Sequence, residues 1–154
     1  MPKGYKIIIT DTSCFSLLRK LDALELLRKL FSQVITTPEI AIEFGDPLPD
    51  WVIVKTVTNT SLQEEFSREV DKGEASAIAL AAEITYDFII LDDADARKFA
   101  ENLGMSVKGT IGLFVIAKNR GFIPLLKPYF DQIQQTNFRI SSAILERVLR
   151  DAGE

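Results

Sequence analysis

Ile7-Ile8-Ile9-Thr10-Asp11-Thr12-Ser13 is a run of β-branched residues that ends in an acid and two hydroxyl side chains. β-branched residues favour strands, and an apolar run without alternation predicts a strand buried on both faces, from Tyr5 to Thr10. Asp11-Thr12-Ser13 then offers side chains that cap helix N-termini. The chain is therefore expected to pass directly from a buried strand into a helical region.

The same alternation of strands and helices continues along the chain. Leucines 17 to 30 indicate one or two amphipathic helices broken near Asp22, and a helix from Pro38 ends at Gly45. Further strands are predicted near 34–35, 51–54, 88–91 and 105–107, and further helices over 61–70, 74–82, 94–103, 109–118, 125–135 and 141–151. Such alternation predicts an α/β fold with a mainly parallel central sheet flanked by helices on both faces.

Length and composition favour one globular domain. The 154 residues, 47% hydrophobic and 26% charged, suffice for a single core. We expect one domain over residues 1–154, with C-terminal helices from about residue 124. The apolar stretches are shorter than a membrane span and the start of the chain lacks a signal-peptide pattern, which predicts a cytoplasmic protein without membrane association.

Charge and residue usage exclude several classes of chemistry. A net charge of −4 argues against a protein that coats nucleic acid by bulk electrostatics, although a nuclease with a few acids in one cleft stays compatible with it. The chain has no histidine and a single cysteine, so an internal disulfide and an ordinary zinc site are both excluded. Cys14 is expected to be a small buried apolar residue.

Acids stand at the junctions between the predicted elements. Asp11 and Asp92-Asp93 directly follow buried strands, whose carboxyl ends share one edge of a parallel sheet. Glu43 and Glu74 lie near helix ends that could reach the same edge. Taken singly, each acid has an ordinary explanation as a helix cap, a partner of the helix dipole or a solvated residue. Together they favour a shared carboxylate site for a hard cation.

A basic segment follows the last of these acids. Its members are Arg97, Lys98, Lys108, Lys118, Arg120 and Lys127, opposed mainly by Glu101. Two interpretations stay open, namely an RNA-facing surface and scattered solvated charge.

The order of these motifs resembles a known family. The motifs are Asp11-Thr12-Ser13, Pro38 with Glu43, Gly73-Glu74-Ala75 and Leu91-Asp92-Asp93, followed by Gly109-Thr110-Ile111-Gly112, Ala117-Lys118 and Gly121-Phe122-Ile123. The first four resemble a PIN domain. The last three are similar to the DUF3368 family, a PIN-like subgroup of bacterial and archaeal proteins related to the VapC toxins. The resemblance runs from Lys6 to about Ile123 and implies a PIN-like three-layer fold.

The resemblance also implies a metal-dependent endoribonuclease that hydrolyses RNA with Mg²⁺ or Mn²⁺. Its acidic quartet would be Asp11, Glu43, Glu74 and Asp93, with Asp92 and Asp95 as secondary metal candidates and Ser13 as a supporting hydroxyl beside Asp11. Glu74 departs from the family pattern, since many PIN nucleases carry aspartate there. The implied partners are an RNA substrate, a small antitoxin if the protein is a toxin, and a second copy that pairs through the terminal helices.

Two other functions compete with this one. The first is a catalytically inactive PIN-like protein that binds nucleic acid or acts as a scaffold. The second is a phosphoacceptor receiver domain, another parallel α/β fold with clustered aspartates. A receiver domain should carry its adjacent acid pair after the first strand, whereas here Asp11 stands alone and the pair Asp92-Asp93 comes late. The receiver domain is therefore disfavoured.

Overall fold

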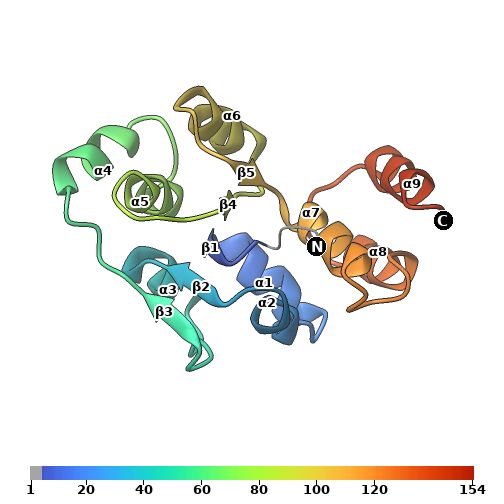
Figure 1. Cartoon of the computed structure of the whole chain (residues 1–154). Helices are drawn as coiled ribbons and strands as arrows, with labels where there is room; N and C mark the ends of the chain where they lie inside the picture. The colour runs from blue at the N-terminus through green and yellow to red at the C-terminus, as the bar shows by residue number, and fades with distance from the viewer. Residues whose placement is uncertain (1–4) are drawn as a thin grey trace.

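A five-stranded sheet forms the centre of the protein (Figure 1), whose computed structural model describes residues 5–154. The strands lie in the order β3-β2-β1-β4-β5, and every neighbouring pair is parallel. The sheet expected to be mainly parallel is thus parallel throughout. Its strands are β1 (Ile7–Thr10), β2 (Gln33–Thr36), β3 (Val52–Val54), β4 (Phe88–Ile90) and β5 (Val107–Lys108).

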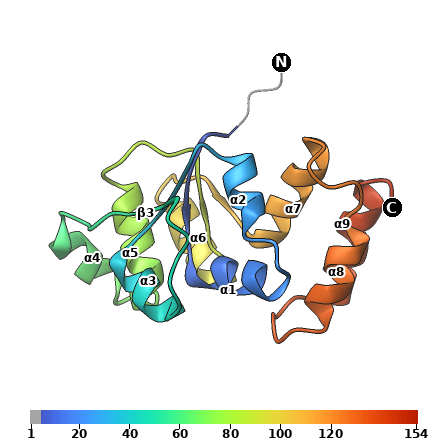
Figure 2. The same cartoon turned by 90° about the horizontal axis from the view of Figure 1, so that it is seen from below.

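Helices cover both faces of the sheet, which confirms the predicted α/β class. The helices α4, α5 and α6 lie on one side, and α1, α2 and α7 lie on the other, with α8 and α9 beyond α7 (Figures 1 and 2). The helix α3 packs against both α1 and α5. Their bounds are α1 (Thr12–Lys20), α2 (Glu25–Leu30), α3 (Pro38–Phe44), α4 (Thr60–Phe66), α5 (Lys72–Ala81), α6 (Ala94–Asn102), α7 (Thr110–Asn119), α8 (Lys127–Gln134) and α9 (Ser142–Asp151).

The core is built on the two central strands. Ile8 and Ile9 of β1 and Ile89 and Ile90 of β4 are fully buried, as expected for strands with helices on both faces. Burying one such side chain stabilises the fold by roughly 1.5–3 kcal/mol relative to leaving it exposed. Cys14 is fully buried too, as predicted, and burial raises the pKa of its thiol. The residues that follow these strands are therefore anchored to the buried core.

Turn residues set several of the predicted boundaries. Asp22 adopts a positive φ of 53° between α1 and α2, where the sequence predicts the break. Gly45 ends α3 with a φ of 83°, a backbone conformation that glycine adopts without steric cost. The helix predicted over 61–70 begins one residue earlier, at Thr60, and ends at Phe66, four residues before the predicted end. The side chain of Asn59 accepts a hydrogen bond from the Leu62 backbone N–H at 3.1 Å and thereby caps α4 from Thr60.

No helix within residues 5–154 is long and apolar enough to span a membrane.

Candidate metal and nucleic-acid site

Two neighbouring strands bring the first predicted acids together. Because β1 and β4 pair in parallel, with Thr10 opposite Ile90, the residues that follow them emerge side by side. The Asp92 backbone N–H donates a hydrogen bond to Asp11 Oδ2 at 3.0 Å. Asp11 Oδ1 accepts another from the Cys14 backbone N–H at 2.9 Å, so the same carboxylate caps α1. The predicted meeting of these strand ends is therefore observed.

A small cavity, which we call the acidic cavity, opens in front of Asp11. Its volume is about 160 Å³, and Asp11, Glu43 and Glu74 all contribute to its wall. The remaining lining residues are Thr12, Ser13, Ile40, Asp71 and Gly73. Within the part of the chain that the structure describes, this wall holds four carboxylates and no lysine or arginine. The acids of this wall therefore have no basic partner among the described residues that line it.

Buried hydroxyl groups join the two helices that carry the glutamates. The hydroxyls of Thr37, which caps α3, and Ser76 in α5 share a hydrogen bond of 2.6 Å, and both residues are fully buried. The Ser76 hydroxyl also lies 2.6 Å from the Gly73 carbonyl, to which it can donate. A buried polar group that lacks a hydrogen-bond partner destabilises the folded protein, so this contact favours the observed packing of α3 against α5. It thereby fixes the positions from which Glu43 and Glu74 reach the cavity.

A side chain at residue 73 would have to displace the Glu43 carboxylate. A Cβ atom at Gly73 would lie 2.8 Å from Glu43 Oε1, closer than such atoms approach. Glu43 also accepts a hydrogen bond from the Thr12 hydroxyl. Its carboxylate is thus held between the start of α1 and the start of α5.

The pKa values of two acids reflect this crowding. Burial raises the pKa of Asp11 well above its ordinary value, and the charges of Asp92 and Glu74 raise it further. Partial burial, with the charges of Asp93, Asp71 and Glu43, raises the pKa of Glu74 to about 7, although a hydrogen bond from the Asp71 backbone N–H opposes the shift. Ionised carboxylates are therefore disfavoured here unless a cation compensates them.

The three acids after β4 lie in different environments. Asp92 accepts hydrogen bonds at 2.7 Å from both the backbone N–H and the hydroxyl of Thr110, so its carboxylate holds the start of α7. Asp93 is exposed and caps α6 through the Ala96 backbone N–H at 2.9 Å. Asp95 is exposed in the first turn of α6, and it lines neither the acidic cavity nor the two larger cavities beside it. The geometry therefore gives Asp95 the weakest support of the three.

The acids of the quartet do not converge as a finished set of metal ligands. Among residues 5–154, no three histidine, cysteine, aspartate or glutamate side chains are grouped closely enough to hold an ion. Three of these carboxylates instead accept hydrogen bonds from the protein itself. Asp11 accepts from two backbone N–H groups, Glu43 from the Thr12 hydroxyl, and Glu74 from the Asp71 backbone N–H. Asp93 lines the two larger cavities and lies outside the wall of the acidic cavity.

The basic segment of the sequence forms no single free surface. Arg97 donates to the carbonyls of Leu91 and Asp92 at 2.9 and 2.8 Å, Lys118 pairs with Glu154 at 2.7 Å, and Arg120 donates to the Leu30 carbonyl at 2.5 Å. These contacts join helices to the rest of the fold. Of the two interpretations left open, the structure favours dispersed charge for this segment.

Several residues at the site escape sequence reasoning. Asp71 lines the acidic cavity, and its position three residues before Glu74 matches the capping-box spacing that could have revealed it. Thr110 stands in the quoted glycine motif, but nothing in that motif indicates its bonds to Asp92. Phe138 and Arg139 reach the sheet edge from the connection between α8 and α9, and no local pattern marks them.

Fold and site together define a PIN domain, a nuclease-type α/β fold with acids at the carboxyl edge of its sheet. The model of the DUF3368 family, described as a PIN domain, matches residues 7–154, and the chain belongs to this family. PIN domains are generally nucleases and typically use divalent metals. Neither the comparison with curated proteins nor the comparison with solved structures gives a match.

Proposed function

We propose that this protein is an endoribonuclease that hydrolyses RNA phosphodiester bonds with Mg²⁺ or Mn²⁺ held at the acidic cavity. The observation that carries the proposal is the acidic cavity itself, where Asp11, Glu43 and Glu74 share one wall without a basic neighbour. Membership of the PIN family supports it from an independent side.

The donor set fits a hard cation. All the polar side chains in the wall offer oxygen atoms, which Mg²⁺ and Mn²⁺ prefer, and soft or imidazole ligands are absent from the cavity's described residues. The raised pKa values of Asp11 and Glu74 point the same way, because a bound cation would stabilise the charged carboxylates that burial and, secondly, neighbouring acids disfavour. When bound, the ion supplies a water of lowered pKa and neutralises charge on the phosphodiester oxygens.

Each acid of the predicted quartet would then have a distinct task. Asp11 is buried and fixed by two backbone N–H groups, so it would be the least mobile ligand. Glu43 and Glu74 would turn from Thr12 and Asp71 towards the ion, since longer side chains can adjust their reach. Asp93 is exposed beside the cavities and would orient the attacking water, with Ser13 as a supporting hydroxyl between the acidic cavity and its neighbour.

A metal titration of RNA cleavage tests the proposal. Wild-type protein should cleave a mixture of structured and single-stranded RNAs only when Mg²⁺ or Mn²⁺ is present. Asp11→Asn should lower the rate about 1000-fold, a loss of about 4 kcal/mol of transition-state stabilisation. Metal-dependent cleavage that survives both Asp11→Asn and Asp93→Asn would reject this site.

An inactive PIN-like protein that binds nucleic acid or acts as a scaffold is the second candidate. The observation in its favour is that the acids of residues 5–154 do not converge as metal ligands. Under this alternative, Mn²⁺ would leave the thermal unfolding temperature unchanged and no RNA would be cleaved. A rise in that temperature with Mn²⁺, lost in Asp11→Asn, would contradict it.

The finer biological role extends the proposal. We propose that the nuclease acts in the cytoplasm as the toxin of a toxin–antitoxin pair, with a small antitoxin that blocks the cleft and with a homodimer as its assembly. Expression of the chain should then arrest growth of a bacterial host, and co-expression of the neighbouring reading frame should relieve the arrest. Growth unaffected by an RNA-cleaving wild-type protein would contradict the toxin role and leave the nuclease intact.

A further inference from the structure

Three cavities follow one another along the carboxyl edge of the sheet. The acidic cavity shares Ser13 with a middle cavity of about 350 Å³, which Lys20 and Asn137 also line. The middle cavity in turn shares four residues with an outer cavity of about 700 Å³. These four shared residues are Asp92, Asp93, Phe138 and Arg139. A chain-like ligand that starts at the acidic cavity would therefore be led towards the outer one.

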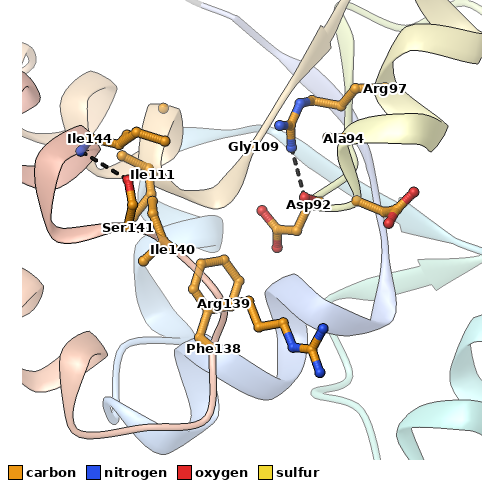
Figure 3. A pocket seen from close by; sticks show the side chains of 12 residues that line it. Asp92, Ala94, Arg97, Gly109, Ile111, Phe138, Arg139, Ile140, Ser141 and Ile144 are labelled. Atoms are coloured by element: carbon orange, nitrogen blue, oxygen red, sulfur yellow. Dashed lines mark hydrogen bonds between the residues drawn. The ribbon is translucent and has the colours of Figure 1, made fainter.

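The outer cavity has two unlike walls (Figure 3). Asp92 and Arg97 stand on the side of the sheet edge, and Ile111, Ile140 and Ile144 gather on the opposite side, where α7 and α9 begin. Ile144 is 53% exposed, so this apolar wall is open to a ligand. The volume of the outer cavity lies within the range of about 300–1,000 Å³ that is usual for small-molecule sites. A ligand with one apolar flat part and one charged part would match these walls.

Arg139 differs from the other basic residues that line these two cavities because its side-chain N–H groups have no partner among the described residues. Its side chain is exposed, and within residues 5–154 its guanidinium has no ion pair or hydrogen bond. Arg97, in contrast, is already bound to two carbonyls, and Lys20 donates to Asn137 Oδ1 at 2.6 Å. A planar guanidinium with free N–H groups matches the oxygens of a phosphate.

We propose that the outer cavity binds one nucleotide of a single-stranded RNA next to the cleaved phosphodiester. Arg139 contacts the phosphate of that nucleotide, and the apolar wall of Ile111, Ile140 and Ile144 receives its base beside Phe138. The strand is single in this proposal, because an unpaired base enters a cavity without the cost of breaking a base pair. The identity of the ligand rests on the proposed nuclease function. Arg139 is in this account a substrate-positioning residue.

Binding of two short ligands separates the two parts of the proposal. One is a fluorescein-labelled single-stranded RNA hexamer, and the other is a hexamer with the same sugar-phosphate backbone and no bases. Affinities are measured by fluorescence polarisation with EDTA present, so that cleavage does not intervene. Wild-type protein should bind the RNA about tenfold more tightly than the abasic ligand, because base contacts contribute on the order of 1–3 kcal/mol each.

Arg139→Gln should weaken binding of both hexamers about tenfold, because it removes a contact to phosphate. It should also reduce the slope of log affinity against log salt concentration by about 0.7, the share of one phosphate on a single strand. The matched control is Arg147→Gln, an equal change of charge at an exposed residue of α9 outside both cavities. Equal effects of Arg139→Gln and Arg147→Gln would overturn the proposal.

Ile144→Ala should weaken binding of the RNA about fivefold and leave the abasic hexamer unchanged, because it removes apolar contact with the base only. Ile42→Ala, at a residue of α3 that is 79% exposed and outside the cavity, is its control. Wild-type protein that binds both hexamers equally would also overturn the proposal.

Cleavage assays keep the two proposals apart. If Asp11→Asn abolishes cleavage and Arg139→Gln changes neither cleavage nor binding, the nuclease stands and the nucleotide site is wrong. If wild-type protein binds the RNA through Arg139 but cleaves none, the nucleotide site stands and the nuclease is wrong.

Discussion

The acidic cavity and the outer cavity lie along one edge of the sheet and differ in almost every physical property. The first is small, has four carboxylates and gathers residues from the start of α1, the end of α3 and the start of α5. The second is larger and half apolar, and it includes Arg97 and Arg139. A small space with four acids in its wall would suit a cation, whereas a wider space of mixed character would suit a nucleotide. Under the two proposals, the metal would bind in the first cavity and the substrate nucleotide in the second.

The two cavities also differ in how they are held. Around the acidic cavity, buried hydrogen bonds such as that between Thr37 and Ser76 fix the helices that carry the acids. The outer cavity takes Phe138 and Arg139 from a connection between helices, tied to α1 by the exposed bond of Lys20 to Asn137. Changes at the acidic cavity should therefore affect metal binding and cleavage, and changes at Arg139 or the apolar wall of the outer cavity should affect affinity for RNA.

The largest effect expected beyond Asp11→Asn is at Asp93, which lines the middle and outer cavities. Asp93→Asn should lower the RNA cleavage rate about 100-fold, because a carboxylate that orients water is lost. Its effect on the free energy of unfolding should stay below about 0.5 kcal/mol, since asparagine caps helices as well as aspartate does. Kinetics and urea unfolding measure the two quantities.

Asp92→Asn is the matched comparison, and it should affect stability more and the cleavage rate less than Asp93→Asn does. It leaves one oxygen where two now accept hydrogen bonds from Thr110, so it should lower the free energy of unfolding by about 1 kcal/mol. Its cleavage rate should exceed that of Asp93→Asn about tenfold. The reverse order of rates would assign the water-orienting role to Asp92.

Gly73→Ala tests the tight packing of the acidic cavity. The added methyl group would push the Glu43 carboxylate away, so the affinity for Mn²⁺ should fall about tenfold. The free energy of unfolding should change little, because a flexible side chain can yield and alanine favours the helix by about 1 kcal/mol. Calorimetric titration and urea unfolding measure the two effects.

Gly112→Ala in α7 serves as the control, since its new Cβ would meet Lys108 at an ordinary 3.6 Å. This variant should keep the wild-type affinity for Mn²⁺. Equal loss of Mn²⁺ binding in both variants would contradict the assigned contact between Gly73 and Glu43.

A last effect concerns the pH dependence of stability. The pKa of Glu74 in the folded protein is about 7, above its ordinary value of 4.5, so the folded state holds a proton that the unfolded state has released between these values. The contribution of Glu74 to the free energy of unfolding is fully present below pH 4.5 and is lost as pH rises through 7. Discounted for the half-exposed position of Glu74, the loss in the metal-free protein should be roughly 1–2 kcal/mol.

Urea unfolding with EDTA, across pH 4.5 to 8, measures how the free energy of unfolding falls as pH rises. Glu74→Gln should flatten this pH dependence, and Glu65→Gln, at an exposed residue of α4, should not. Asp11 acts in the same direction, so some slope should persist in Glu74→Gln. A stability that rises with pH over this range would contradict the account.

The residues that sequence reasoning predicted are those governed by local rules. A β-branched run followed by an acid predicts both β1 and the place of Asp11, because strand formation and helix capping depend on neighbours in sequence. Asp92 and Asp93 follow from the same rule at β4. The contact between Asp11 and Asp92 needed one further rule, that parallel strands end at the same edge.

The residues that sequence reasoning missed depend on contacts between distant segments. Arg139 is 46 residues from Asp93 in the chain and reaches the site only through the packing of α8 and α9. The division between Asp92 and Asp93 depends on Thr110, which is 18 residues from Asp92. Neither periodicity nor capping patterns carry such information.

Calorimetric titration with Mn²⁺ of wild-type protein, Asp11→Asn and Arg139→Gln tests the division between the two cavities most directly. Mn²⁺ should bind to wild-type protein and to Arg139→Gln with equal affinity, and its binding to Asp11→Asn should fall at least about 100-fold. Mn²⁺ binding that survives Asp11→Asn unchanged would place the cation elsewhere and contradict the central claim that the acidic cavity is the metal site.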